Sequence, residues 1–113
     1  MLMNSDLTSE VHDLKFRLQW GQPGFTIIDV RDRHTYNQSR ITGAIAIPLN
    51  ELVERATSTL HKDRHIYIYG NEDTQAGYAV QLLRAAGFTN VIHIHGGLSA
   101  WITVGGATEG IAA

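Results

Sequence analysis

Cysteine does not occur among the 113 residues of this chain. Its absence excludes disulfide bonds, thiolate metal sites, iron–sulfur clusters and every thiol nucleophile. Proline is also scarce, with 2 residues, whereas 43% of the residues are hydrophobic and 18% are charged. That balance excludes disordered and collagen-like chains. The sequence therefore predicts a folded protein whose chemistry does not use a cysteine side chain.

Strong charge and long apolar runs are missing as well. The formal net charge is −2, from 9 basic and 11 acidic residues, and no basic stretch stands out. We therefore expect no nucleic-acid binding through bulk electrostatics. No apolar run approaches the about 20 residues that a membrane helix needs, and residues 1–6 lack the charged-then-apolar order of a signal peptide. These absences predict no membrane association and a cytoplasmic location.

Short strand-like runs alternate with helical patterns, which is typical of an α/β domain with a largely parallel sheet. Apolar and β-branched runs predict strands at 25–30, 45–47, 65–69 and 91–95. Apolar residues at three- and four-residue spacing predict helices within 7–18, 50–56 and 74–86, with shorter ones within 31–40 and around Trp101. We expect Trp20 and Trp101 to anchor the core. The domain is predicted to cover residues 1–103, followed by a flexible C-terminal tail over 104–113, where the periodicity ends.

In such folds, ligands bind beyond the carboxyl ends of the parallel strands. One loop at such an end, residues 70–75, consists of Gly70, Asn71, Glu72, Asp73, Thr74 and Gln75. Backbone N–H groups that lead into a helix form an anion cradle in this position. However, Glu72 and Asp73 bring two negative charges, and no lysine or arginine occurs between Arg64 and Arg84. We expect Asp73 to cap the following helix and Glu72 to face solvent.

Three segments carry a resemblance to a known family. They are Ile28-Asp29-Val30-Arg31 with Tyr36, then residues 40–49, and finally Phe88-Thr89-Asn90-Val91 through Gly96-Gly97-Leu98-Ser99-Ala100-Trp101. In this order and spacing, over roughly residues 7–102, the chain resembles the rhodanese (thiosulfate sulfurtransferase) homology domain. The resemblance implies a rhodanese-like α/β fold with a five-stranded parallel sheet and helices on both faces. It also implies that Asp29 and Arg31 form a structural pair near the site.

The resemblance places Gly70 where catalytic members of the family have a cysteine that carries sulfur as a persulfide. Glycine has no side chain, and no other residue of this chain is a cysteine. We therefore predict no catalytic residue, no metal and no cofactor, and interpret the chain as an inactive homologue rather than an enzyme. We expect the chain to act as a protein-interaction or regulatory module. In this interpretation the acidic loop 70–75 recognises a basic segment of a partner protein.

Two other interpretations stay open at this point. The pocket of such a domain can be reused for carboxylate- or metal-assisted hydrolysis, with Glu72 and Asp73 as acid and base, or with His65, His93 and His95 as zinc ligands. His93 and His95 are two residues apart on a predicted strand, so both point to one face of the sheet. Alternatively, Gly70 is an engineered replacement in an active thiosulfate sulfurtransferase. The acidic neighbours of Gly70 argue against engineering, because a single laboratory substitution leaves the surrounding loop unchanged.

Overall fold

The structure is a computed structural model that describes residues 2–21 and 24–111, with side chains from Glu10 onward. Helices and strands alternate along the chain as the sequence predicts. In chain order they are α1 (Leu2–Gln19), β1 (Phe25–Asp29), α2 (Arg33–Gln38), β2 (Arg40–Ile41), β3 (Ile45–Ala46), the 3₁₀ turn η1 (Leu49–Glu51), α3 (Leu52–Thr59), β4 (His65–Tyr69), α4 (Asp73–Ala85), β5 (Val91–His93), α5 (Gly97–Thr103) and β6 (Thr108–Glu109). Within the described ranges, no helix has the length and apolar content needed to cross a bilayer.

The central sheet has four parallel strands in the order β3-β1-β4-β5. Its strands match the four that the apolar runs predict, whereas the five strands implied by the family resemblance are not found in the described part of the chain. The remaining two strands, β2 and β6, pair with each other in an antiparallel ribbon. In the central sheet, Asp29 at the end of β1 is in register with Tyr69 at the end of β4. The segments that follow these two strands are therefore neighbours at the carboxyl edge.

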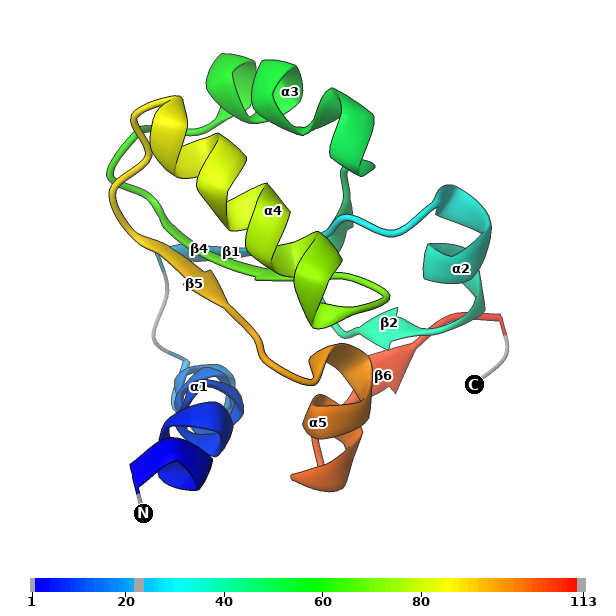
Figure 1. Cartoon of the computed structure of the whole chain (residues 1–113). Helices are drawn as coiled ribbons and strands as arrows, with labels where there is room; N and C mark the ends of the chain where they lie inside the picture. The colour runs from blue at the N-terminus through cyan, green and yellow to red at the C-terminus, as the bar shows by residue number, and fades with distance from the viewer. Residues whose placement is uncertain (1, 22–23, 112–113) are drawn as a thin grey trace.

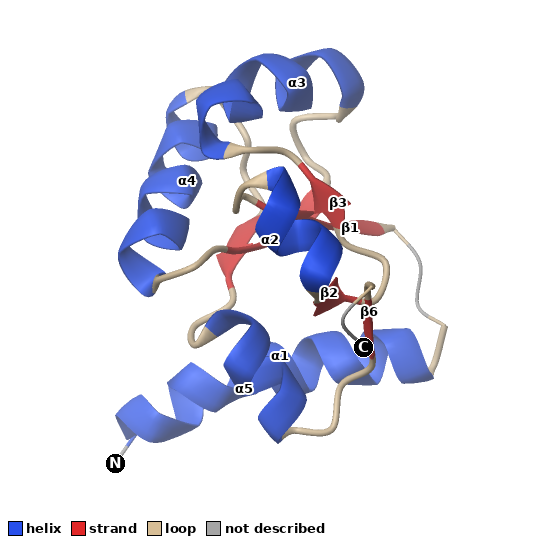
Figure 2. Ribbon diagram, turned by 90° about the vertical axis from the view of Figure 1, so that its right-hand side faces the viewer, coloured by secondary structure: helices blue, strands red, loops and turns tan. Residues whose placement is uncertain are grey.

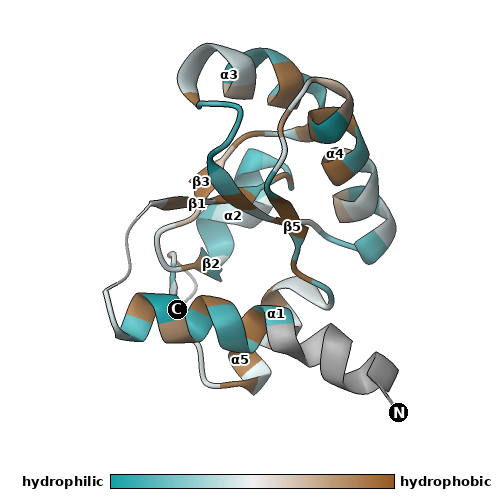
Figure 3. Ribbon diagram, turned by 90° about the vertical axis from the view of Figure 1, so that its left-hand side faces the viewer, coloured by the Kyte–Doolittle hydropathy of each residue, from teal (hydrophilic) through white to brown (hydrophobic). Residues whose placement is uncertain are grey.

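Helices cover both faces of the sheet, as predicted. In Figures 1 and 2, α3 and α4 lie on one face and α1 and α5 lie on the other. Two apolar clusters fill the space between these layers, and hydrophobic residues in β1 and β5 colour the sheet brown in Figure 3. One cluster joins Ile28 and Ile68 to Leu83 of α4, and the other joins Tyr67 to Leu14 of α1 and Trp101 of α5. Burial of apolar surface on both sides of one sheet is the main force that holds this fold together.

The described part of the predicted tail, residues 104–111, folds back on the domain. β6 pairs with β2, and the Ile111 N–H donates to the Asn37 carbonyl at 3.0 Å. The indole N–H of Trp101 donates to the Ala107 carbonyl at 2.7 Å, which fixes the turn before β6. Trp101 is buried as predicted, whereas Trp20, at 65% exposure, does not anchor the core.

Candidate functional site

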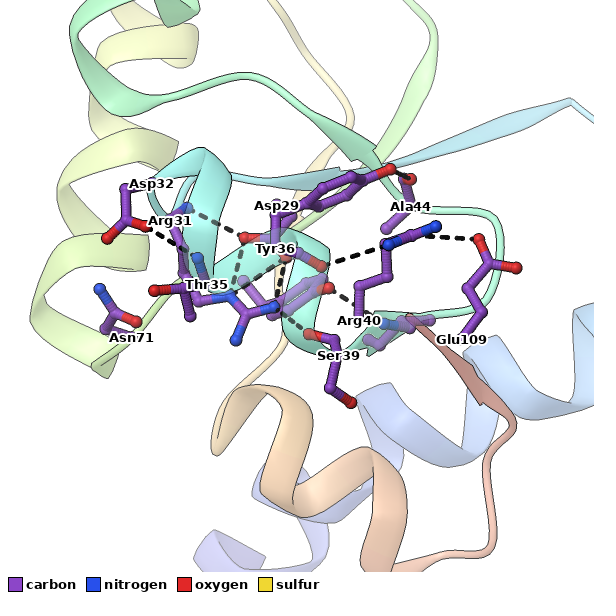
Figure 4. Close-up of polar contacts among 12 residues, drawn as sticks. Asp29, Arg31, Asp32, Thr35, Tyr36, Ser39, Arg40, Ala44, Asn71 and Glu109 are labelled. Atoms are coloured by element: carbon purple, nitrogen blue, oxygen red, sulfur yellow. Dashed lines mark hydrogen bonds and ion pairs between the residues drawn. The ribbon is translucent and has the colours of Figure 1, made fainter. Parts of the chain in front are cut away.

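Asp29 and Arg31 form a buried pair at the carboxyl edge of the sheet. The Arg31 guanidinium donates to both carboxylate oxygens of Asp29, at 2.7 Å from Nη2 and at 2.9 and 3.1 Å from Nε. The Arg31 backbone N–H donates to Asp29 at 2.9 Å, and Nη2 also donates to the Ser39 carbonyl at 2.7 Å (Figure 4). Because both side chains are almost completely buried, each depends on the other for its charge to be compensated. The pair ties β1 to the segment after α2.

The ring of Tyr69 completes this buried layer. Its hydroxyl accepts a hydrogen bond from the Ile41 N–H at 3.1 Å, and its ring lies 5.3 Å from the Arg31 guanidinium carbon. Burial, and next the charge of Asp29, raise the pKa of the Tyr69 hydroxyl far above its ordinary value. Tyr69 is therefore a neutral structural group that fixes the backbone immediately before Gly70.

The side chain of Gln75 folds back against loop 70–75. Gln75 Oε1 accepts the backbone N–H of Asn71 at 2.7 Å. A Cβ at position 70 would lie 3.2 Å from Val30 Cγ2 and from Gln75 Cδ, and closer still to Gln75 Oε1. The Gln75 carboxamide thus occupies the space that a side chain at position 70 would need. This role of Gln75 is not visible in the sequence pattern, because it depends on the side chain turning back by one helical turn.

The start of α4 corrects one sequence-based interpretation. Asp73 does not cap the helix: the N-cap residue is Glu72, and its side chain makes no capping hydrogen bond. The Asp73 carboxylate instead accepts the Gly96 N–H at 2.9 Å and so connects loop 70–75 to the turn before α5. Glu72 is exposed, and its carboxylate accepts the Thr74 hydroxyl at 3.3 Å. The acidic face of the loop therefore consists of one anchored carboxylate and one that is available to a partner.

His93, the last residue of β5, and His95, just after the strand, have neighbouring rings. Their rings are 3.9 Å apart between centroids and tilted by 30°. Glu10 of α1 holds His95, since its carboxylate lies 2.8 Å from His95 Nδ1 and accepts the His95 backbone N–H at 3.1 Å. His93 Nε2 is buried without a hydrogen-bond partner, although it lies 3.3 Å from Asp73 Oδ1. Burial, followed by repulsion from His95, lowers the pKa of His93.

The histidines do not converge into a metal centre. His65 begins β4 at the opposite end of the sheet, where its Nδ1 lies 3.3 Å from Arg17 Nη1. Among the side chains that the structure describes, no group of three or more histidines, aspartates or glutamates is suited to a metal ion. What sequence reasoning missed here is Glu10, which lies 85 positions from its partner His95 and belongs to no motif.

Comparisons with known proteins give the same architecture. The family model for the rhodanese-like domain matches residues 10–103. The crystal structure of the Alr3790 protein from Anabaena sp. is similar, with a TM-score of 0.87 and 56% identity over 91% of this chain and 92% of that one.

Two curated relatives match over shorter segments. Thiosulfate sulfurtransferase PspE of Escherichia coli (strain K12) is 42% identical over 65 residues, which are 57% of this chain and 62% of PspE. The YqhL protein of Bacillus subtilis (strain 168) is 33% identical over 75 residues, which are 66% of this chain and 59% of YqhL. The chain therefore spans less than two thirds of the length of these curated relatives.

Proposed function

Because the chain belongs to the rhodanese-like family, we propose that it is a non-catalytic member that binds a protein partner through loop 70–75. The observation that carries the proposal is the glycine at position 70. Sulfur transfer by a persulfide needs a sulfur atom on a side chain, and the chain holds no cysteine at position 70 or elsewhere. This chain therefore has no cysteine sulfur atom that could carry the persulfide of rhodanese chemistry.

The surroundings of Gly70 support binding rather than a repositioned active site. The Gln75 carboxamide takes the N–H of Asn71 and the space beside Gly70, so that a small anion such as thiosulfate would have to displace it. Glu72 is exposed next to this space and repels an incoming anion, whereas it attracts a lysine or arginine side chain. The loop is thus complementary to a basic segment of a partner protein.

Sulfur loading tests the non-catalytic half of the proposal. The protein is incubated with thiosulfate and its intact mass is measured, with PspE of E. coli treated in parallel as a positive control. We expect no mass increase by a sulfur atom and only background formation of thiocyanate when cyanide is added. Covalent sulfur on this chain, or turnover above that of the heat-denatured protein, would refute the proposal.

Charge reversal in the loop tests the binding half. Immobilised wild type and the Glu72→Lys variant are used to recover binders, and each binder is then purified and titrated against both proteins. Asp63→Lys serves as the matched control, because Asp63 is equally an exposed carboxylate but lies before β4, whereas the loop follows the other end of that strand. We expect a purified binder to lose affinity for Glu72→Lys and to keep it for Asp63→Lys. Equal titration curves for all three proteins would remove loop 70–75 from the recognition surface.

A further inference from the structure

A groove with a volume of 810 Å³ opens beside loop 70–75. Gln75 belongs to both the loop and the groove wall, so the two features form one continuous surface. The other walls come from the segment after β1, from the turn η1, and from the facing sides of α3 and α4. Concave sites of this size are typical of ligand pockets and of grooves that accept a side chain of a partner.

Two helices expose apolar side chains to solvent in the groove. Val53 of α3 is 36% exposed and Tyr78 of α4 is 54% exposed, and both line it. Leu49 and Leu82 line it as well and are only partly buried. Exposed aromatic and aliphatic side chains that face one cavity are typical of interaction sites. One large apolar side chain of a partner would cover them.

The charges around this apolar surface have one sign. Asp32 and Glu54 line the groove, and no lysine, arginine or histidine does so among the described residues. Hydrogen bonds from Thr35 lower the pKa of Asp32, so its carboxylate stays ionised at neutral pH. The groove therefore combines an apolar interior with a negative rim.

Arg33 and Arg55, which directly follow Asp32 and Glu54 in the chain, have contacts outside the groove. Arg33 places its guanidinium over the ring of Tyr36, at 5.8 Å from the centroid. Arg55 lies 3.4 Å from Glu51 and donates to the Ala46 carbonyl at 3.3 Å. The exposed carboxylates of Asp32 and Glu54 are therefore available to a cation of a partner.

We propose that the groove binds an extended segment of a partner protein in which one large apolar side chain is flanked by lysine or arginine. The apolar side chain lies between Val53 and Tyr78, and the flanking cations face Asp32 and Glu54. The inference rests on the proposed function, because it assigns the chemistry of the partner recognised next to loop 70–75. A phosphate-bearing ligand is disfavoured, since every charge on the groove wall would repel it.

Fluorescence anisotropy with a defined peptide tests the proposal. The probe is fluorescein-labelled Lys-Lys-Ser-Phe-Ser-Lys-Lys, with one control peptide in which serine replaces phenylalanine and another in which glutamate replaces every lysine. We expect saturable binding of the probe only. Tyr78→Ser should weaken it by about tenfold or more, and Glu54→Gln by about two- to fivefold, with a steeper salt dependence for wild type. Ile102→Ser and Asp63→Asn are matched controls at exposed positions outside the groove.

Each outcome decides between the two proposals. Absence of saturable binding, or binding that Tyr78→Ser and Glu54→Gln leave unchanged, would overturn the groove assignment. If Glu72→Lys alone abolished binding, the loop would remain the recognition surface without the groove. If Tyr78→Ser instead converted a dimer to a monomer in analytical ultracentrifugation, the groove would bind a second copy and not a basic segment. Sulfur loading of the chain by thiosulfate would refute the proposed function independently of these results.

Discussion

Replacement of Arg31 by methionine removes the positive member of the buried pair and leaves Asp29 without a counter-charge. The Asp29 carboxylate has no solvent exposure, and three of its contacts to Arg31 come from the guanidinium. Removing one partner of a buried ion pair costs about 3–5 kcal/mol of unfolding free energy, because the remaining charge stays desolvated. Domains of this size are stable by about 5–15 kcal/mol. Arg31→Met is therefore expected to fold, but with a large part of its stability lost.

Urea denaturation followed by circular dichroism measures this loss. At an m-value of about 1–3 kcal/mol/M, the expected change lowers the midpoint by about 2 M. The double variant Asp29→Asn/Arg31→Met should be more stable than Arg31→Met alone, because it contains no uncompensated charge. Arg31→Lys keeps the charge and should lie between wild type and Arg31→Met. A loss below about 1 kcal/mol for Arg31→Met, or a double variant less stable than the single one, would refute this reasoning.

Three further predictions concern residues around the site. Burial keeps the pKa of His93 below the 6.5 of the unfolded chain, so the unfolded state binds a proton first as the pH falls. The free energy of unfolding should therefore decrease from about pH 6.5 down to the folded pKa. His93→Phe should flatten this decrease in urea titrations at a series of pH values. Gly97 has a φ of +53°, and a Cβ there would lie 3.2 Å from the Gly70 carbonyl oxygen. Gly97→Ala should therefore cost about 1–2 kcal/mol in thermal melts. Gly70→Ala should cost less, because Gly70 does not have a left-handed φ and its Cβ would meet only side-chain atoms, those of Gln75 and Val30. Trp101→Phe removes the hydrogen bond to the Ala107 carbonyl, and amide hydrogen exchange over 107–111 should accelerate, whereas Trp20→Phe should leave it unchanged.

The architecture could be predicted from the sequence because its signals are local. Apolar runs and helical spacing indicated the four parallel strands and the helices between them, and each lies where the pattern placed it. A fifth strand of the parallel sheet was implied only by the family resemblance, and the described residues do not contain it. The β2–β6 ribbon was not predicted, because strands of two residues contain too few positions to show an apolar period.

The position of loop 70–75 at the carboxyl edge of the sheet could be predicted, but the contacts of its side chains could not. Loop 70–75 was singled out because it follows the end of a predicted strand, whereas the pair of Asp29 and Arg31 was implied by the family resemblance. Asp73 was assigned to the wrong partner, because a helix cap is the nearest acceptor role in sequence, whereas the Gly96 N–H comes from a different loop.

The sequence by itself determined that position 70 carries no side chain and that no sulfur atom of a cysteine exists to replace one. Only the tertiary structure decided that Gln75 occupies the vacant space, that Glu10 holds His95, and that an apolar groove with an acidic rim continues from the loop. The physical reason is that the covalent structure of each residue, including the missing side chain of Gly70, is fixed by the sequence alone. A cavity and its charges, by contrast, depend on which distant side chains the packing of helices on both sheet faces brings together.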